Sequence, residues 1–201
     1  MTRLIVISNE TDFPGEVTLI NELFRSEMRL FHLRKPSWSI DDQRSFLSKI
    51  EKQFLSRISV HQHHSTIQEF DLKYYHVKES DRKKNPELIR DKNLKYSTSF
   101  HKYSDLQFES NNWDYCFLSP VFDSISKQGY KSLLADNFSI TGDFHKKVFA
   151  LGGVSSENIE EIFNKDFFGA AVLGSVWSDT NNAVNNFVQL NRKCNQTVHT
   201  F

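Results

Sequence analysis

Short apolar runs alternate along the chain with longer segments in which apolar residues recur at helical spacing. The run Leu4–Ser8 (LIVIS) is typical of a buried strand, whereas Glu16–Met28 has the spacing of a helix. Similar runs predict further strands at Arg29–Leu33, Arg57–His61, Tyr74–Lys78, Leu94–Ser99, Tyr115–Ser119, Val148–Leu151 and Ala170–Leu173. The segments between them predict helices at Asp41–Leu55 (with Asp41 as N-cap), Ser65–Phe70, Pro86–Lys92, Ser104–Ser110, Ser156–Asn164 and Asn182–Leu190.

Strands that alternate with helices predict a parallel sheet joined by right-handed crossovers. Eight repeats favour closure into a (β/α)8 TIM barrel, and near-continuous apolar strands agree with a sheet covered on both faces. A doubly wound open sheet is the competing fold, but no G-x-G-x-x-G follows the first strand. We therefore predict one α/β domain over residues 1–201, with the barrel at about 4–190 and a polar C-terminal tail that frays.

Composition argues against several classes of function. The formal net charge is zero, which argues against a broad basic surface for nucleic acid. No apolar run reaches the roughly 18–20 residues of a membrane span, and no signal peptide opens the chain, so we expect no membrane partner. Cys116 and Cys194 fit buried or incidental thiols in a reducing cytoplasm better than a disulfide framework.

The chemistry of a TIM barrel lies at the carboxyl ends of its strands. In this chain Gly152-Gly153 ends the seventh strand and Gly174-Ser175 ends the eighth. Glycine lets backbone N–H groups approach phosphate oxygens closely, and the loops after strands seven and eight form the usual phosphate site of this fold. A tight strand-to-helix turn would explain Gly152-Gly153 alone, but the two turns together predict a phosphate cup.

A second anion site is predicted after strands two and six. Arg34 ends strand two, and the segment Phe117–Ser132 (FLSPVFDSISKQGYKS) changes from an apolar strand to a loop of hydroxyls and lysines that includes Lys127. Each charged hydrogen bond to a phosphate could contribute about 1.5–3 kcal/mol. A solvated rim without a ligand is the alternative for both cations.

Two carboxylates at the end of strand four could hold Mg2+. Glu79 and Asp81 lie two apart in a segment that we expect to be extended, so they would point the same way. Mg2+ needs only one or two protein carboxylates when substrate phosphates complete its shell. A solvated loop is the alternative.

His61 and His63 form a His-x-His pair at the end of strand three, a pattern that can bind zinc or iron. His76 and His101 could add ligands. We favour imidazoles without a metal, because the spacing fixes no third ligand.

Six segments resemble, in order, the strand-end motifs of the thiamine phosphate synthase/TenI superfamily: LFHLRKP, YYHVKESD, STSFH, FLSPVFDSISK, ALGGVSSENI and GAAVLGSVW. The similarity covers Leu4 to about Trp177. It implies the same barrel and, for the synthase, Mg2+-dependent joining of a pyrimidine diphosphate to a thiazole phosphate with release of pyrophosphate. The resemblance implies that the diphosphate is held by Arg34, Ser124, Ser126 and Lys127, and that Ser99 donates a hydrogen bond to the departing group. It implies Asp81 as the Mg2+ ligand. The thiazole phosphate would be bound by Gly153, Gly174 and Ser175, with Gly152 beside them.

The sequence departs from the synthase pattern at two strand ends. The synthase motif Arg-Glu-Lys is here Arg34-Lys35-Pro36, so Lys35 is expected to replace the missing lysine in holding substrate. The synthase pair Asn-Asp, whose aspartate binds Mg2+, is here His61-Gln62. This pairing makes His61 a candidate substrate-binding residue and removes a carboxylate, and we expect Glu79 to compensate.

Other functions stay open beside the synthase. The TenI branch is a metal-independent thiazole tautomerase with a histidine after strand five, where His101 lies; an imidazole there could move protons at neutral pH. A non-catalytic thiamine-ligand-binding barrel and a metal-dependent hydrolase built on His61 and His63 are further alternatives. Arg34, Asp81 and Lys127 favour the synthase. The family is commonly oligomeric, so a homo-oligomer is compatible with the resemblance, although no interface is visible in the sequence.

Overall fold

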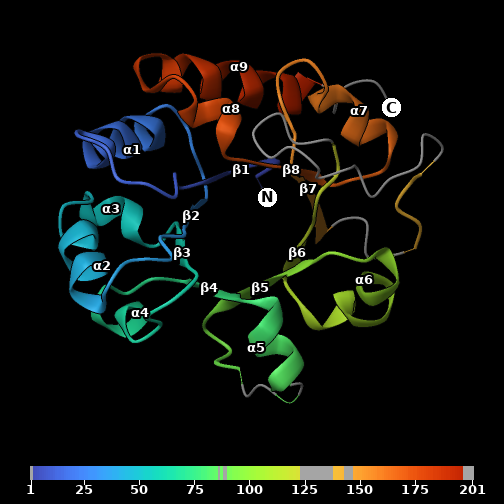
Figure 1. Cartoon of the computed structure of the whole chain (residues 1–201), viewed down its shortest axis with the longest axis horizontal. Helices are drawn as coiled ribbons and strands as arrows, with labels where there is room; N and C mark the ends of the chain where they lie inside the picture. Colours follow the sequence, from blue (N-terminus) through green and yellow to red (C-terminus); the bar gives the residue numbers. More distant parts are fainter. Residues whose placement is uncertain (1, 86, 88–89, 123–137, 143–146, 197–201) are drawn as a thin grey trace.

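The computed structural model describes residues 2–85, 87, 90–122, 138–142 and 147–196. Within them, eight parallel strands pair in chain order, and the eighth pairs with the first to close a barrel. Figure 1 shows the strands around the centre and the helices outside them. The predicted (β/α)8 barrel is confirmed, and the open doubly wound sheet is excluded because such a sheet would leave its edge strands unpaired.

The strands lie within about three residues of their predicted positions. Parallel pairing sets one register around the barrel, with His32 opposite Ser59 and His76 opposite Ser97. Since all strands run the same way, all their carboxyl ends meet at one mouth. The strands are β1 (Leu4–Ile7), β2 (Phe31–Leu33), β3 (Ile58–Val60), β4 (Tyr74–Val77), β5 (Lys95–Phe100), β6 (Tyr115–Leu118), β7 (Val148–Leu151) and β8 (Gly169–Val172).

The helices surround the barrel, and most are short. The longest of them, α1 and α9, are amphipathic and bury one face against β1 and each other. The helices are α1 (Glu16–Arg25), α2 (Ile40–Leu47), α3 (Lys52–Leu55), α4 (Thr66–Glu69), α5 (Glu79–Lys84), α6 (Tyr103–Glu109), α7 (Ile159–Asn164), α8 (Gly174–Trp177) and α9 (Ala183–Gln196), with 3-10 turns η1 (Ser110–Asn112) and η3 (Thr180–Asn182).

The helix predicted over Asp41–Leu55 is two helices, α2 and α3, and its predicted N-cap is wrong. Ser39 caps α2: its hydroxyl accepts from the N–H of Asp42, and the Asp42 carboxylate accepts from the N–H of Ser39. This reciprocal capping box satisfies two free donors, whereas Asp41 alone would satisfy one.

Further helix boundaries differ from the prediction, among them the start of α7 at Ile159 instead of Ser156. The helix after β4 is α5, which starts at Glu79 directly behind the strand, and the described residues between 86 and 92 are not helical. The expected fraying tail is helical as far as Gln196, because the apolar face of α9 continues to Cys194, which is fully buried. The prediction of a frayed tail rested on the polar residues of α9, which lie on its exposed face.

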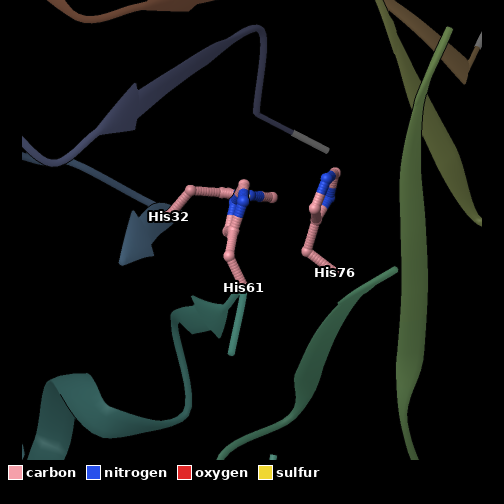
Figure 2. Close-up of side chains that lie close together, drawn as sticks. All are labelled: His32, His61 and His76. Atoms are coloured by element: carbon pink, nitrogen blue, oxygen red, sulfur yellow. The ribbon is translucent and has the colours of Figure 1, made fainter. Parts of the chain in front are cut away.

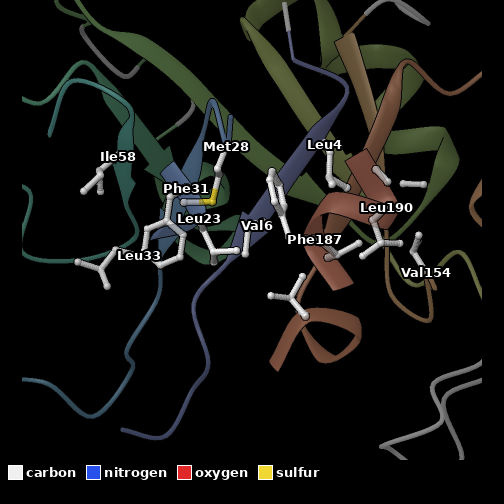
Figure 3. Packing of buried hydrophobic residues seen from close by; sticks show 14 of the residues in the cluster. Leu4, Val6, Leu23, Met28, Phe31, Leu33, Ile58, Val154, Phe187 and Leu190 are labelled. Carbon is white, nitrogen blue, oxygen red and sulfur yellow. The ribbon is translucent and has the colours of Figure 1, made fainter. Parts of the chain in front are cut away.

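The larger hydrophobic core lies between the barrel and its helices. Outward-facing side chains of β1 and β2, among them Leu4, Val6 and Phe31, are buried against α1 and α9. Figure 3 shows this packing around Leu23 and Phe187. It fixes the strands from outside and leaves the barrel interior free to carry other side chains. No helix in the described part of the chain is long and apolar enough to span a bilayer.

The barrel interior is divided into an apolar and a polar half. Strands β6, β7, β8 and β1 fill their side with a compact cluster that includes Tyr115, Phe117 and Phe149. Strands β2–β5 instead bury polar side chains, so the expectation of near-continuous apolar strands is wrong for them. These buried polar residues are His32, Ser59, His61, His76 and Ser97.

Candidate active site at the carboxyl ends of the strands

The residues singled out from the sequence follow different strands, and the barrel gathers the ends of those strands at one mouth. The glycine turns follow β7 and β8, and the charged and imidazole groups follow β2–β5. Ser124, Ser126 and Lys127 lie outside the described residues, so their predicted diphosphate contacts stay predictions.

The turn after β7 requires glycine. Gly152 and Gly153 have φ values of 92° and 67°, in the left-handed region that disfavours other residues. A Cβ on Gly152 would lie 3.0 Å from Pro120, so the backbone of this turn approaches the loop after β6 closely. The Gly153 carbonyl accepts a hydrogen bond of 2.8 Å from Asn158 Nδ2, which fixes the path into α7.

The turn after β8 is open and polar. Gly174 is exposed, and a Cβ added to it would meet nothing within 4 Å. Ser175 Oγ is buried, yet it has no hydrogen-bond partner among the described residues. Since buried hydroxyls are normally paired, an unpaired Oγ beside free N–H groups at the start of α8 suits an anion such as phosphate.

Arg34 lies at the mouth with its backbone held in place. Ser8 Oγ accepts from the Arg34 N–H at 2.8 Å and donates to the Arg34 carbonyl at 2.9 Å. The guanidinium pairs with Glu10, and the Arg34 side chain is 39 % exposed. An incoming phosphate could therefore reach it by displacing a surface carboxylate, an exchange of low cost because exposed ion pairs are weak.

Lys35 is not at the mouth surface, and the structure contradicts its expected role in holding substrate. Its side chain is 0 % exposed. Its ammonium donates to Glu16 at 2.7 Å, Asp12 at 3.0 Å and the Thr11 carbonyl at 3.2 Å, which uses all three N–H groups. Lys35 therefore ties β2 to the start of α1 and has no N–H left for a phosphate.

Glu79 and Asp81 do not form the expected carboxylate pair. They lie on α5 and not on an extended segment, and residues two apart on a helix point about 200° apart. Glu79 pairs with Lys83 at 2.7 Å and points away from Asp81, so the observed geometry does not support Glu79 as the missing Mg2+ ligand. Asp81 is exposed and has no ion pair among the described residues. It lines a cavity of about 200 Å³ with His64, Tyr75 and Val77, on the side of β4 that packs against the outer core and not on the side of the barrel interior.

The donor set at this end of the barrel therefore fits Mg2+ only in part. One carboxylate without an ion pair among the described residues, Asp81, suits an ion whose other ligands are substrate phosphates and water. A site built from two protein carboxylates does not fit the arrangement seen here.

Three histidines meet inside the barrel just below the mouth (Figure 2). His32 Nδ1 lies 2.9 Å from His61 Nε2, and the rings of His61 and His76 stack with centroids 3.9 Å apart. Burial, followed by the charge of neighbouring groups, lowers the pKa of all three, that of His76 to about 3. All three imidazoles are therefore neutral at pH 7.

The His-x-His pattern of His61 and His63 does not bring the two imidazoles together. His63 Nε2 bonds the Trp38 carbonyl at 2.8 Å, away from the barrel interior. His61 is only 5 % exposed and contacts other histidines, so its expected contact with substrate stays a prediction. The sequence interpretation missed His32, which is the neighbour of His61 in the cluster. β2 has only three residues, so an alternating pattern could not be recognised and the inward-facing position of His32 was not predicted.

Ser99 and His101 lie at the end of β5. Ser99 Oγ is 3.4 Å from His76 Nε2, which links the mouth to the buried histidines. His101 is exposed, and its Nδ1 lies 2.9 Å from the Ser119 carbonyl, which requires that this nitrogen carries the proton. Nε2 of His101 is then free to exchange a proton with a ligand, although Glu79 lies 3.8 Å away.

Comparison with known proteins decides the family. The family profile described as thiamine monophosphate synthase matches residues 4–176. The chain belongs to this family. A search of curated protein sequences found no match.

Solved structures agree with this assignment. The chain superposes on a thiamine phosphate pyrophosphorylase from Bacteroides thetaiotaomicron with a TM-score of 0.73 and 25% identity, covering 98% of each chain. A thiamine phosphate pyrophosphorylase from Pyrococcus furiosus gives 0.71 at 16% identity, covering 98% and 96%. A 3-hexulose-6-phosphate synthase shares the fold alone, with 0.59 at 10% identity over 96% and 99%.

Proposed function

We propose that this chain is a thiamine phosphate synthase, which joins a hydroxymethylpyrimidine diphosphate to a thiazole phosphate and releases pyrophosphate. Family membership over residues 4–176 supports the reaction class. The observation that carries the proposal at the level of the site is the open turn at Gly174-Ser175, whose buried hydroxyl lacks a partner among the described residues. It lies on the loop after β8, where barrels of this kind bind phosphate.

In the proposed reaction, the two substrates bind on opposite sides of the mouth. The phosphate of the thiazole would contact the N–H groups and hydroxyl at Gly152-Gly153 and Gly174-Ser175. The diphosphate of the pyrimidine would contact Arg34, together with the predicted residues Ser124, Ser126 and Lys127. This arrangement would hold the thiazole nitrogen next to the pyrimidine methylene carbon, which is how an enzyme converts a bimolecular step into a unimolecular one.

The chemical step needs stabilisation of the leaving group more than acid–base chemistry. The methylene–oxygen bond breaks, its electron pair leaves with pyrophosphate, and the thiazole nitrogen forms the new C–N bond. Arg34 would neutralise charge on the leaving group, and Ser99 would donate a hydrogen bond to it. Mg2+, held by Asp81 and the diphosphate, would supply further neutralisation of that charge when bound.

The test is formation of thiamine phosphate from both substrates as Mg2+ is varied. Asp81→Asn should raise the Mg2+ concentration for half-maximal rate by at least about 10-fold, because loss of even a group that only orients a metal ligand can cost that much. Glu79→Gln is the matched control on the same helix: its carboxylate pairs with Lys83, so the Mg2+ requirement should not change. Equal effects of both substitutions would contradict the proposed metal ligand.

The thiazole tautomerase is the second candidate. It is favoured by the exposed His101, whose Nε2 is available for proton transfer, and by the absence of a carboxylate at Gln62. It would need the phosphate cup but no Mg2+. Isomerisation without metal, lost in His101→Gln, would select it, and binding of the thiazole phosphate without turnover of either kind would instead indicate a non-catalytic barrel.

The remaining expectations belong to the same proposal. We place the enzyme in the cytoplasm, since Cys116 and Cys194 are both unpaired and buried. Its partners would be the two small phosphorylated substrates, with no nucleic acid. A homo-oligomer stays a prediction, to be tested by the mass of the protein in solution.

A further inference from the structure

We propose that His32, His61 and His76 form a binding site for a first-row divalent metal ion, with Zn2+ as the best fit, separate from the Mg2+ site of the proposed reaction. One ring nitrogen from each histidine lies within 4.8 Å of those of the other two. Figure 2 shows the side chains entering one space from the neighbouring strand ends of β2, β3 and β4. Each ligand therefore has a separate, rigid backbone support.

The spacing of the nitrogens is close to that of a zinc site. Nitrogens around a tetrahedral Zn2+ with bonds of about 2.0–2.1 Å lie about 3.4 Å apart. His32 Nδ1 and His61 Nε2 are 2.9 Å apart, and the third nitrogen is no farther than 4.8 Å. Binding would also require the stacked rings of His61 and His76, whose planes lie 22° apart, to rotate until both in-plane lone pairs point at the same ion. The hydrogen bond between His32 and His61 would be replaced by two metal–nitrogen bonds.

The outer nitrogens of two of these rings already have the partners that metal-binding histidines use. His32 Nε2 bonds Tyr115 OH at 2.8 Å, and His76 Nδ1 bonds Ser97 Oγ at 2.9 Å. Histidines that bind metals almost always donate their second N–H to such a group, which orients the ring and sets its tautomer. In this arrangement His32 Nδ1 and His76 Nε2 present lone pairs to the cluster.

The chemistry of the site selects the type of ion. Imidazole nitrogens suit zinc, copper, iron and nickel, whereas Mg2+ requires oxygen ligands. Burial keeps all three rings neutral, which is the form that binds metal. The partly exposed Ser99, whose Oγ is 3.4 Å from His76 Nε2, marks the side that faces the mouth. A water or a ligand atom from the mouth would complete four-coordination there, as in zinc sites that keep one open position.

The test is titration of chelator-treated protein with Zn2+ and with Co2+ as a spectroscopic probe. We expect one ion per chain, visible absorption typical of four-coordinate Co2+, and retention of that signal in excess Mg2+. At a Zn2+ concentration of about 100 times Kd, the melting temperature should rise by roughly 5–10 °C.

Variants separate the three-histidine site from adventitious binding. His61→Gln and His76→Gln should each weaken binding by at least about 100-fold, and Tyr115→Phe, which removes only the outer hydrogen bond, by about 10-fold. His63→Asn is the matched control, since His63 bonds the Trp38 carbonyl and should not affect binding. An equal loss in His63→Asn and His61→Gln would overturn the proposal.

Two outcomes on the wild-type protein also decide the question without any variant. Absence of Zn2+ and Co2+ binding would mean that the cluster is a neutral hydrogen-bonded network and nothing more. If the glutamine variants fail to fold, X-ray absorption of the Zn2+-loaded wild type replaces them. Three imidazole ligands would support the site, and any other ligand set would overturn it. Both measurements report metal binding directly, so a protein without synthase activity would leave their interpretation unchanged.

Discussion

Replacing Lys35 with methionine tests whether this lysine stabilises the fold or binds substrate. Lys35 is fully buried, and its ammonium donates to Glu16, Asp12 and the Thr11 carbonyl. It also lies 5.1 Å from the centroid of the Trp38 ring. Methionine has a similar length and fills much of the same space without the charge, so the substitution removes the interactions with little change in packing.

The expected cost is large because the partner is buried too. Glu16 is 5 % exposed; its Oε2 accepts from Lys35, and its Oε1 has no hydrogen-bond partner among the described residues. Removing one member of a buried ion pair costs about 3–5 kcal/mol, a large share of the roughly 5–15 kcal/mol that stabilises a typical domain. The double substitution Lys35→Met with Glu16→Leu removes both charges and should recover most of that loss, since apolar replacements of buried pairs are often neutral or better.

The cost should also depend on pH. Burial raises the pKa of Glu16 even with Lys35 beside it, and loss of Lys35 would raise this pKa further. An acid whose pKa is higher in the folded than in the unfolded state binds more protons when folded, so stability increases as pH falls through the folded-state pKa and levels off below the unfolded one. Lys35→Met should therefore be more destabilising at pH 8 than at pH 5.

Urea unfolding followed by circular dichroism measures the free energy, and the KM for the pyrimidine diphosphate measures the effect on substrate. We expect a loss of about 3–5 kcal/mol at pH 8 and a KM within about threefold of wild type in whatever fraction remains folded. A stability within about 1 kcal/mol of wild type, combined with a KM raised more than about 10-fold, would refute this reasoning. Lys35 would then hold substrate, as the sequence pattern predicted.

Two further substitutions test the phosphate cup. Gly152→Ala should cost about 1–3 kcal/mol of stability and weaken thiazole phosphate binding, because φ is 92° and the new Cβ would lie 3.0 Å from Pro120. Gly174→Ala is the control for stability, since a Cβ there would meet nothing within 4 Å. A similar loss of stability in Gly174→Ala would contradict the account. Ser175→Ala should raise the unfolding free energy by up to about 1 kcal/mol, because it removes a buried hydroxyl without a partner among the described residues, while it weakens phosphate binding about 10-fold. Calorimetric titration with the thiazole phosphate, alongside thermal unfolding, measures both effects, and unchanged phosphate affinity in Ser175→Ala would exclude this hydroxyl from the cup.

The barrel could be predicted from the sequence because it rests on local patterns. Each strand is a short run that contains apolar or β-branched residues, and most strands are followed by a segment of helical spacing, so the order of elements is visible without knowing any contact. The glycine turn after β7 was also visible, because it depends on local backbone conformation. The φ values of 92° and 67° at Gly152 and Gly153 favour glycine whatever the rest of the fold is.

The partners of charged and imidazole side chains could not be predicted in this way. Lys35 appeared free because its partner Glu16 lies 19 residues earlier and is brought to it only by the packing of α1. The segment around Glu79 was expected to be extended, because no sequence signal showed that α5 starts directly after β4. His32 lies on a three-residue strand, which is too short for a period of two to show which side faces the barrel interior.

The most direct test of the proposed function is formation of thiamine phosphate by the purified protein from hydroxymethylpyrimidine diphosphate and thiazole phosphate, with and without Mg2+. The account predicts product only when both substrates and Mg2+ are present, with one pyrophosphate released for each thiamine phosphate formed. Absence of product under these conditions, while the thiazole phosphate still binds at the cup, would contradict the assignment as a synthase.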